Sequence, residues 1–406
     1  MSSMLGVRFS GPLESYATGF ASELLQLGYT SNGARAQLRL VAHLSRWLAD
    51  RGLGVAVLRS PGLVEEFFAA RRDAGYRDMR TPKALVPLLE FFRDRGVVAE
   101  TAAAGPMTPA EVLLDRYRSY LVGERCLAAS TAQDYLWAVR PFVAGLADAD
   151  GQLQLDRVSA GAVAAFVLEA SRNQARGSAK LVVTALRSLL RFLHVEGLVP
   201  SSLVTAVPSV ASWRLAGLPK GLTADEVARL LSSCDRRTRV GRRDFAILLV
   251  LVRLGLRAGE VAHLELDDID WRAGELVVRG KGDRHERLPL PDDVGQALVG
   301  YLQRGRPATA QQRRLFIRVR APHRGLTTPA VSHVVLAAGQ RAGLADPIRA
   351  HRLRHTAATG LLAAGASLDE IGQLLRQRSR LTTAIYAKVD RQALRSLARR
   401  WPGGGA

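Results

Sequence analysis

The chain has 406 residues, a formal net charge of +20 and an isoelectric point near 11.0. Its two cysteines, Cys126 and Cys234, have no partner at Cys-x-x-Cys spacing, which argues against a disulfide framework and a zinc site. The length suffices for two or three domains. No signal-peptide pattern or membrane-length apolar run is present, so we expect a cytoplasmic protein without a membrane partner.

The positive charge is concentrated in the C-terminal half. Between Pro219 and Trp401 there are 33 Lys and Arg against 18 Asp and Glu, a balance of +15, whereas the other residues have 24 and 19, a balance of +5. A genome rich in arginine codons explains part of this composition but not its concentration in one half. The distribution is typical of a polyanion-binding protein, and nucleic acid is the expected partner.

Two similar apolar patterns occupy the first two hundred residues. One stripe at helical spacing recurs at an offset of 98 residues, as Leu38, Val41, Leu44, Leu48 and as Leu136, Val139, Phe142, Leu146. Another, 88–98, recurs as 189–199, and both copies contain a glycine, Gly96 and Gly197, where a helix C-cap is expected. We interpret 1–100 and 107–200 as tandem helical modules. The alternative is that any two amphipathic helices resemble each other.

The remaining chain has a mixed pattern. The stretch Val199–Thr223 has three prolines and little apolar pattern, and its residues 201–218 are expected to be a linker, as is the small-residue stretch Ala99–Pro109. In the domain predicted for 219–402, Thr223 and Glu226 form a capping box, and 246–256 is apolar enough for a buried helix. The next stretch, GELVVRGKGDRHERLPLP, predicts a β-hairpin, followed by helices. The expected fold is multidomain and mostly α, with a mixed α/β third domain containing a small hairpin or sheet.

Several charged residues that could take part in a reaction follow one another through this third domain. Arg257 ends the apolar helix, and Glu260 follows it in GLRAGE. Lys281 lies in the hairpin turn. The stretch HRLRHT places His351 and Arg354 one helical turn apart, on one face. Two arginines from separate elements can clamp one phosphate, because each presents a planar, permanently charged fork.

The series ends with Gln377 in LLRQRS and Tyr386 nine residues later. A phenol has a pKa near 10 and needs a base or a positive field to act as a nucleophile; His351 is the candidate acid or base. Taken singly, each residue has a structural interpretation: Arg257 a helix-terminal charge, Lys281 a solvated turn and Tyr386 a core aromatic. Their order favours an active site for breaking a phosphodiester.

The order and spacing of these residues in 222–390, and the sequence around them, resemble the tyrosine recombinase, or phage integrase, family. That family has Arg in a GLRxxE box, Lys in a hairpin, H-x-L-R-H-T, a second His or Trp in an LGH-like box, and then Tyr. Here Gln377 replaces the second His or Trp, and the text is LLRQRS instead of one like LLGHSS. Gln377 can still donate a hydrogen bond to a phosphate oxygen but cannot change protonation state.

The resemblance implies a DNA strand-exchange enzyme. Tyr386 would form a 3′-phosphotyrosyl bond and release a 5′-hydroxyl, with Lys281 protonating the leaving oxygen, and neither ATP nor a metal would be needed. A SAM-like core-binding domain at 107–200 and a catalytic domain at 219–402 would grip double-stranded DNA, with 1–100 as an additional DNA-binding module. A homotetramer on two DNA sites would be the working form. Seven arginines are candidate DNA-backbone contacts: Arg313, Arg314, Arg318, Arg320, Arg376, Arg378 and Arg380.

Other interpretations stay open. A type IB topoisomerase shares this chemistry, although two binding modules favour defined sites. A DNA-binding subunit of a recombinase assembly, with weak or no cleavage, is supported by Gln377 alone. The apolar residues of 390–401 predict a tail helix that docks on a neighbouring protomer or on its own core. The additional first module favours integration or transposition of a mobile element, by analogy with the family.

Overall fold

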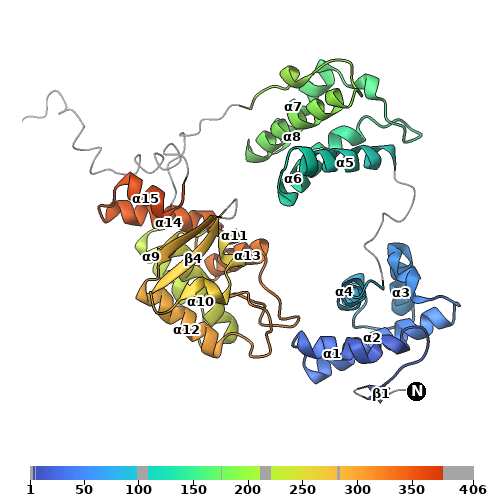
Figure 1. The fold of residues 1–406 in the computed structure, drawn as a ribbon, viewed down its shortest axis with the longest axis horizontal. Coiled ribbons are helices and arrows are strands. Elements are labelled where there is room, and N and C mark those ends of the chain that lie inside the picture. The colour runs from blue at the N-terminus through green and yellow to red at the C-terminus, as the bar shows by residue number, and fades with distance from the viewer. Residues whose placement is uncertain are drawn as a thin grey trace, which may run out of the picture. The chain divides into compact units, whose positions relative to one another are not determined.

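The computed structural model describes residues 3–4, 6–97, 108–174, 176–210, 221–280 and 284–377. The chain divides into two compact units: Glu100–Arg214 forms one, and Met1–Ala99 with Leu215–Ala406 forms the other. Helices predominate in both, as predicted, and the strands of the described residues form two small antiparallel sheets (Figure 1). In the described part of the chain, no helix is long and apolar enough to cross a bilayer.

The first module consists of helices and one pair of two-residue strands. These elements are β1 (Ser3–Met4), β2 (Val7–Arg8), α1 (Ala17–Gln26), α2 (Ser31–Ala49), α3 (Pro61–Asp73) and α4 (Val86–Asp94). Helix α2 is capped by Thr30, whose side chain accepts a hydrogen bond from the Gly33 N–H. The predicted apolar stripe of α2 is buried in the core: Leu38, Val41, Leu44 and Leu48.

The described residues of the second unit include four α-helices around their own apolar core. They are α5 (Pro109–Ser119), α6 (Ala129–Ala144), α7 (Ala160–Asn173) and α8 (Arg176–Val195). Gly197 follows α8 with φ +68°, and Gly96 follows α4 with φ +65°, so both predicted caps are left-handed glycines. The described part of the predicted linker, 201–210, packs on this core. Val207 is buried there, and its carbonyl accepts a hydrogen bond from Arg187 at 2.9 Å.

Helix α10 (Arg239–Leu254) is the centre of the third segment. Its buried, apolar side chains contact the helices around it, and the predicted capping box of Thr223 and Glu226 begins α9 (Ala224–Ser232). The other helices are α11 (Ala258–His263), α12 (Asp292–Arg304), α13 (Thr328–Arg341), α14 (Ala350–Ala363) and α15 (Leu368–Leu374). Helices follow the hairpin, as predicted, but the predicted helical pattern was wrong for 305–327. This glycine- and proline-containing stretch is irregular, with isolated bridges.

The predicted hairpin is present as β4 (Glu275–Gly280) and β5 (Arg284–Pro289), paired antiparallel from Glu275 opposite Pro289 to Gly280 opposite Arg284. A third strand, β3 (Ile269–Asp270), pairs with β4 and was not predicted. Two residues are too few for an alternating pattern to show in sequence. The hairpin turn with Lys281 and the tail helix predicted for 390–401 lie outside the described residues.

The position at which α10 ends shows that Arg257 was assigned to the wrong helix. The helix stops at Leu254, because Gly255 adopts a left-handed conformation with φ +58°. Arg257 is therefore not the last residue of the buried helix but the N-cap of α11. The interpretation of Arg257 as a charge at a helix C-terminus is wrong for this reason.

Replacement of Gly255 by alanine tests this junction. An added Cβ would lie 2.6 Å from Cδ2 of Leu375, in a backbone conformation that already disfavours a side chain. We expect Gly255→Ala to lower the free energy of unfolding by about 2–4 kcal/mol. Gly274→Ala is the matched control, since φ is +66° and nothing lies within 4 Å; it should lose about 1 kcal/mol. Equal thermal destabilisation of both variants would contradict the close approach.

Candidate active site

The structure brings four of the six predicted site residues onto three adjacent elements. Arg257 begins α11, His351 and Arg354 lie in the first turns of α14, and Gln377 follows α15. Lys281 and Tyr386 lie outside the described residues.

Arg257 is held by Glu260, which lies three residues later in the sequence. Glu260 Oε1 accepts from the Arg257 guanidinium at 2.6 Å, and Oε2 accepts from the Arg257 backbone N–H at 2.8 Å. The Glu260 side chain is 7% exposed and that of Arg257 51%. One buried carboxylate therefore caps the helix and fixes one edge of a guanidinium that stays accessible to solvent.

Arg354 is 2% exposed and joins two helix ends. Its Nη1 donates to the carbonyl of Gly255 at 2.6 Å, and its Nη2 donates to the carbonyl of Leu375. These carbonyls belong to the C-cap residues of α10 and α15, where the helix dipole is negative and favours a cation. Each carbonyl lies two residues before another predicted site residue, Arg257 or Gln377.

His351 lies within electrostatic range of both arginines. Partial desolvation, followed by the charges of Arg354 and Arg257, lowers the pKa of His351 although the residue keeps contact with solvent. Its ring meets that of His355 edge-on, at 4.5 Å between centroids. Burial, then His351 and Arg354, lowers the pKa of His355 to about 4. Both imidazoles are therefore neutral at pH 7 and able to accept a proton.

Arg376 is the site residue whose role the sequence did not reveal. We predicted it as a DNA-backbone contact, but its side chain is 4% exposed and its Nη2 lies 2.7 Å from Glu260 Oε2. Burial raises the pKa of Glu260, and this effect is outweighed by the charge of Arg376 and hydrogen bonds from Arg257, which hold the pKa below its ordinary value. Arg376 is thus engaged inside the protein. Arg378 and Arg380 lie outside the described residues.

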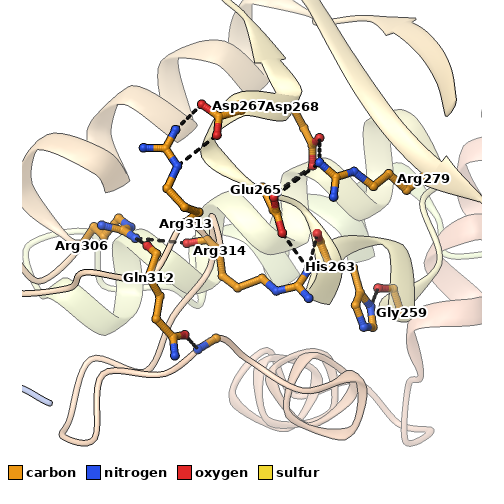
Figure 2. A network of polar contacts seen from close by, with 11 residues as sticks. Gly259, His263, Glu265, Asp267, Asp268, Arg279, Arg306, Gln312, Arg313 and Arg314 are labelled. Atoms are coloured by element: carbon orange, nitrogen blue, oxygen red, sulfur yellow. Dashed lines mark hydrogen bonds and ion pairs between the residues drawn. The ribbon is translucent and has the colours of Figure 1, made fainter.

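A second network anchors the hairpin at its β4 strand (Figure 2). Arg279 contacts Asp268 at 3.0 Å and Glu265 at 3.4 Å, and Glu265 lies 3.6 Å from Arg314. Arg313 pairs with Asp267, with its Nε 3.0 Å from Oδ2. Two of the arginines predicted to contact DNA are therefore engaged with acidic side chains of the protein. Arg279 lies two residues before Lys281 in sequence, so the network fixes the strand that leads into the hairpin turn.

Comparison with known proteins places these features in a family. Residues 220–393 match the phage integrase family, and 114–197 match the phage integrase N-terminal SAM-like domain. The chain is 40% identical to the proposed integrase/recombinase y4rA of Sinorhizobium fredii, covering 97% of this chain and 95% of that protein. It is 34% identical to the tyrosine recombinase XerD of Mycobacterium tuberculosis, covering 71% of this chain and 96% of XerD.

Solved structures share the fold at lower identity. XerH recombinase bound to its palindromic difH substrate in a post-cleavage complex has a TM-score of 0.57 and 20% identity, covering 72% of this chain and 97% of XerH. Lambda integrase (residues 75–356), solved as a dimer on a COC′ core site, has a TM-score of 0.53 and 22% identity, covering 72% of this chain and 98% of that one.

The chain belongs to the phage integrase family of tyrosine recombinases. It is a site-specific DNA recombinase, an enzyme that breaks and rejoins DNA. This confirms the family, the mostly α fold with its mixed third domain, and the class of function that the motifs predicted.

The histidine pair predicts an acid-sensitive site. The pKa of His355 in the folded state, about 4, lies below the ordinary value of 6.5, so protonation favours the unfolded chain. The stabilising contribution is complete above about pH 6.5 and is lost as pH falls towards 4. We expect the melting temperature of the wild type to fall between pH 7 and 5, and that of His355→Gln to fall less. Parallel melting curves over this range would contradict the buried neutral imidazole.

Proposed function

We propose that Arg257, Lys281, His351, Arg354, Gln377 and Tyr386 form the active site and that Tyr386 is the nucleophile. The observation that carries this proposal is the convergence around Arg354. Its two backbone hydrogen bonds fix the segments of Arg257 and Gln377 beside the helix that presents His351. Arginine and glutamine side chains can donate hydrogen bonds to the oxygens of one phosphate, and histidine can in addition exchange a proton.

The proposed reaction is a transesterification. The Tyr386 phenol loses its proton, with neutral His351 as the acceptor, and its oxygen attacks the phosphorus of the scissile phosphodiester. The bond from phosphorus to the 5′-oxygen breaks, and Lys281 gives that oxygen a proton. The products are a 3′-phosphotyrosyl DNA and a 5′-hydroxyl. Attack by a 5′-hydroxyl from a second strand reverses these steps and reseals DNA, so bond energy is conserved without ATP.

Arg257 is the residue best placed to stabilise the phosphate as it gains charge. Its guanidinium is pinned by Glu260 on one edge but remains half exposed. Positive charge fixed beforehand lowers the barrier because no reorganisation is needed when the transition state forms. Gln377 is proposed to contribute a neutral hydrogen bond in place of a charged one.

The biological setting is proposed as integration or transposition of a mobile element. Similarity to the proposed integrase/recombinase y4rA along 97% of this chain supports that setting. We further propose double-stranded DNA contacts by both N-terminal helical modules and a homotetramer on two DNA sites in the cytoplasm, with partner recombinases in some assemblies. Lambda integrase, which shares the fold with a TM-score of 0.54 and 22% identity, has been solved as a tetramer bound to a Holliday junction.

The nucleophile is tested by covalent trapping. DNA from the flanks of the gene, nicked so that the cleaved strand diffuses away, should give an SDS-resistant protein–DNA band that Tyr386→Phe abolishes. Arg257→Lys should form the band about 100- to 1,000-fold more slowly while still retarding DNA. Arg253→Lys is the matched control, because Arg253 pairs with Asp293 on the exposed surface. DNA retardation without any covalent band would favour the binding-only subunit, and supercoil relaxation without site preference would favour a topoisomerase.

Gln377 gives a second, independent test. In Gln377→His the new imidazole can carry a positive charge at pH 6, which glutamine cannot. We expect the variant to cleave nicked DNA faster than the wild type at pH 6, with a smaller advantage at pH 8. An unchanged rate at both pH values would show that this side chain does not reach the phosphate.

A further inference from the structure

Helix α15 ends with an arginine in a conformation that usually belongs to glycine. Arg376 has φ +53°, in the left-handed region. The backbone N–H groups of Arg376 and Gln377 close the helix on the carbonyls of Gln373 and Gly372, each at 2.9 Å. A sequence like LLGHSS would have glycine at the position of Arg376. This chain carries the strain of a large side chain instead.

The side chain of Arg376 turns inward and meets the residues that support the site. Nη2 lies 2.7 Å from Glu260 Oε2, and Nη1 donates to the carbonyl of Leu374 at 3.0 Å. Nε lies 3.9 Å from an oxygen of Glu286 on β5, the strand that leaves the hairpin turn. One buried cation therefore contacts both the carboxylate that holds Arg257 and the hairpin that carries Lys281.

Glu260 is shared between two guanidinium groups. Its Oε2 accepts from Arg376 and from the Arg257 backbone, while Oε1 accepts from the Arg257 side chain. Glu260 is buried and Arg257 is half exposed, so the second, buried cation is needed to keep this carboxylate ionised and in one rotamer. Without it, the exposed guanidinium would be the carboxylate's remaining ion-pair partner among the described residues.

We propose that Arg376 is a positioning residue: it fixes Glu260, and Glu260 thereby holds the guanidinium of Arg257 where the scissile phosphate binds. This inference rests on the active site proposed above. It assigns a role within the DNA-cleavage reaction to an arginine that never has to touch DNA. A buried ion pair that serves folding alone would leave the mobility of Arg257 unchanged when Arg376 is replaced.

The first experiment measures that mobility in the full chain without DNA. The guanidinium Nη–H signal of Arg257 is assigned in the NMR spectrum by its loss in Arg257→Lys, because Nη1 donates the hydrogen bond to Glu260. We expect Arg376→Met to speed the hydrogen exchange of this signal about tenfold or more, and Arg376→Lys to restore part of the protection. In the Glu260→Gln background, Arg376→Met should add nothing further. Arg253→Met is the control and should leave the signal unchanged.

The second experiment measures covalent adduct formation on the nicked DNA used for Tyr386. Arg376→Met should retard DNA as the wild type does but form the adduct about tenfold or more slowly, with partial rescue by Arg376→Lys. Unchanged Arg257 exchange in Arg376→Met, or an adduct rate equal to that of an active wild type, would overturn the proposal. Failure of the wild type to form any adduct would instead refute the proposed active site, and the NMR result would still decide whether Arg376 holds Arg257.

Discussion

The site depends on one buried cation, Arg354. Its guanidinium is almost fully removed from solvent and cannot lose its proton, so its charge must be satisfied by fixed acceptors. The acceptors are the carbonyls of Gly255 and Leu375, at the C-terminal ends of α10 and α15. One side chain of α14 therefore joins the ends of α10 and α15. Arg257, His351 and Gln377 take their places from that junction.

Around this junction the charges form two layers. The inner layer pairs Glu260 with Arg257 and Arg376 and leaves Arg257 half exposed. The outer layer, Arg279 with Asp268 and Glu265, holds the hairpin strand through a nearly buried aspartate. Both layers convert part of the chain's large positive charge into internal ion pairs. Arg376, one of the predicted DNA contacts, is therefore buried at 4% exposure, whereas Arg313 stays 61% exposed beside Asp267.

Much of the fold followed from local patterns. The capping box at Thr223, the left-handed glycines at Gly96 and Gly197, and the β4–β5 hairpin are short-range features, and all are present. The two-residue strand β3 was missed because pairing with β4, not its own sequence, defines it. The end of α10 was misplaced because Gly255 stops the helix before Arg257.

The sequence also predicted part of the candidate site. Motif order predicted Arg257, His351 and Arg354 as site residues, and the structure places them near one another through contacts with Glu260, Gly255 and Leu375. Sequence could not assign Arg376, because its partner Glu260 lies 116 residues away along the chain. Nothing in the local charge pattern distinguishes Arg376 from Arg378 and Arg380, which follow it in the sequence. The sequence signal was an arginine at the end of a helix, where glycine is usual. It could be interpreted only once the structure showed the left-handed backbone of Arg376.

The most direct test of the proposed chemistry is to identify the atom that carries DNA. After trapping on nicked DNA, trypsin should release the eight-residue peptide 381–388, LTTAIYAK, because cleavage follows Arg380 and Lys388. Mass spectrometry should then show this peptide bearing a nucleotide on the Tyr386 oxygen. A nucleotide on any other side chain, or an intact unmodified peptide recovered from a purified covalent complex, would contradict the proposed nucleophile.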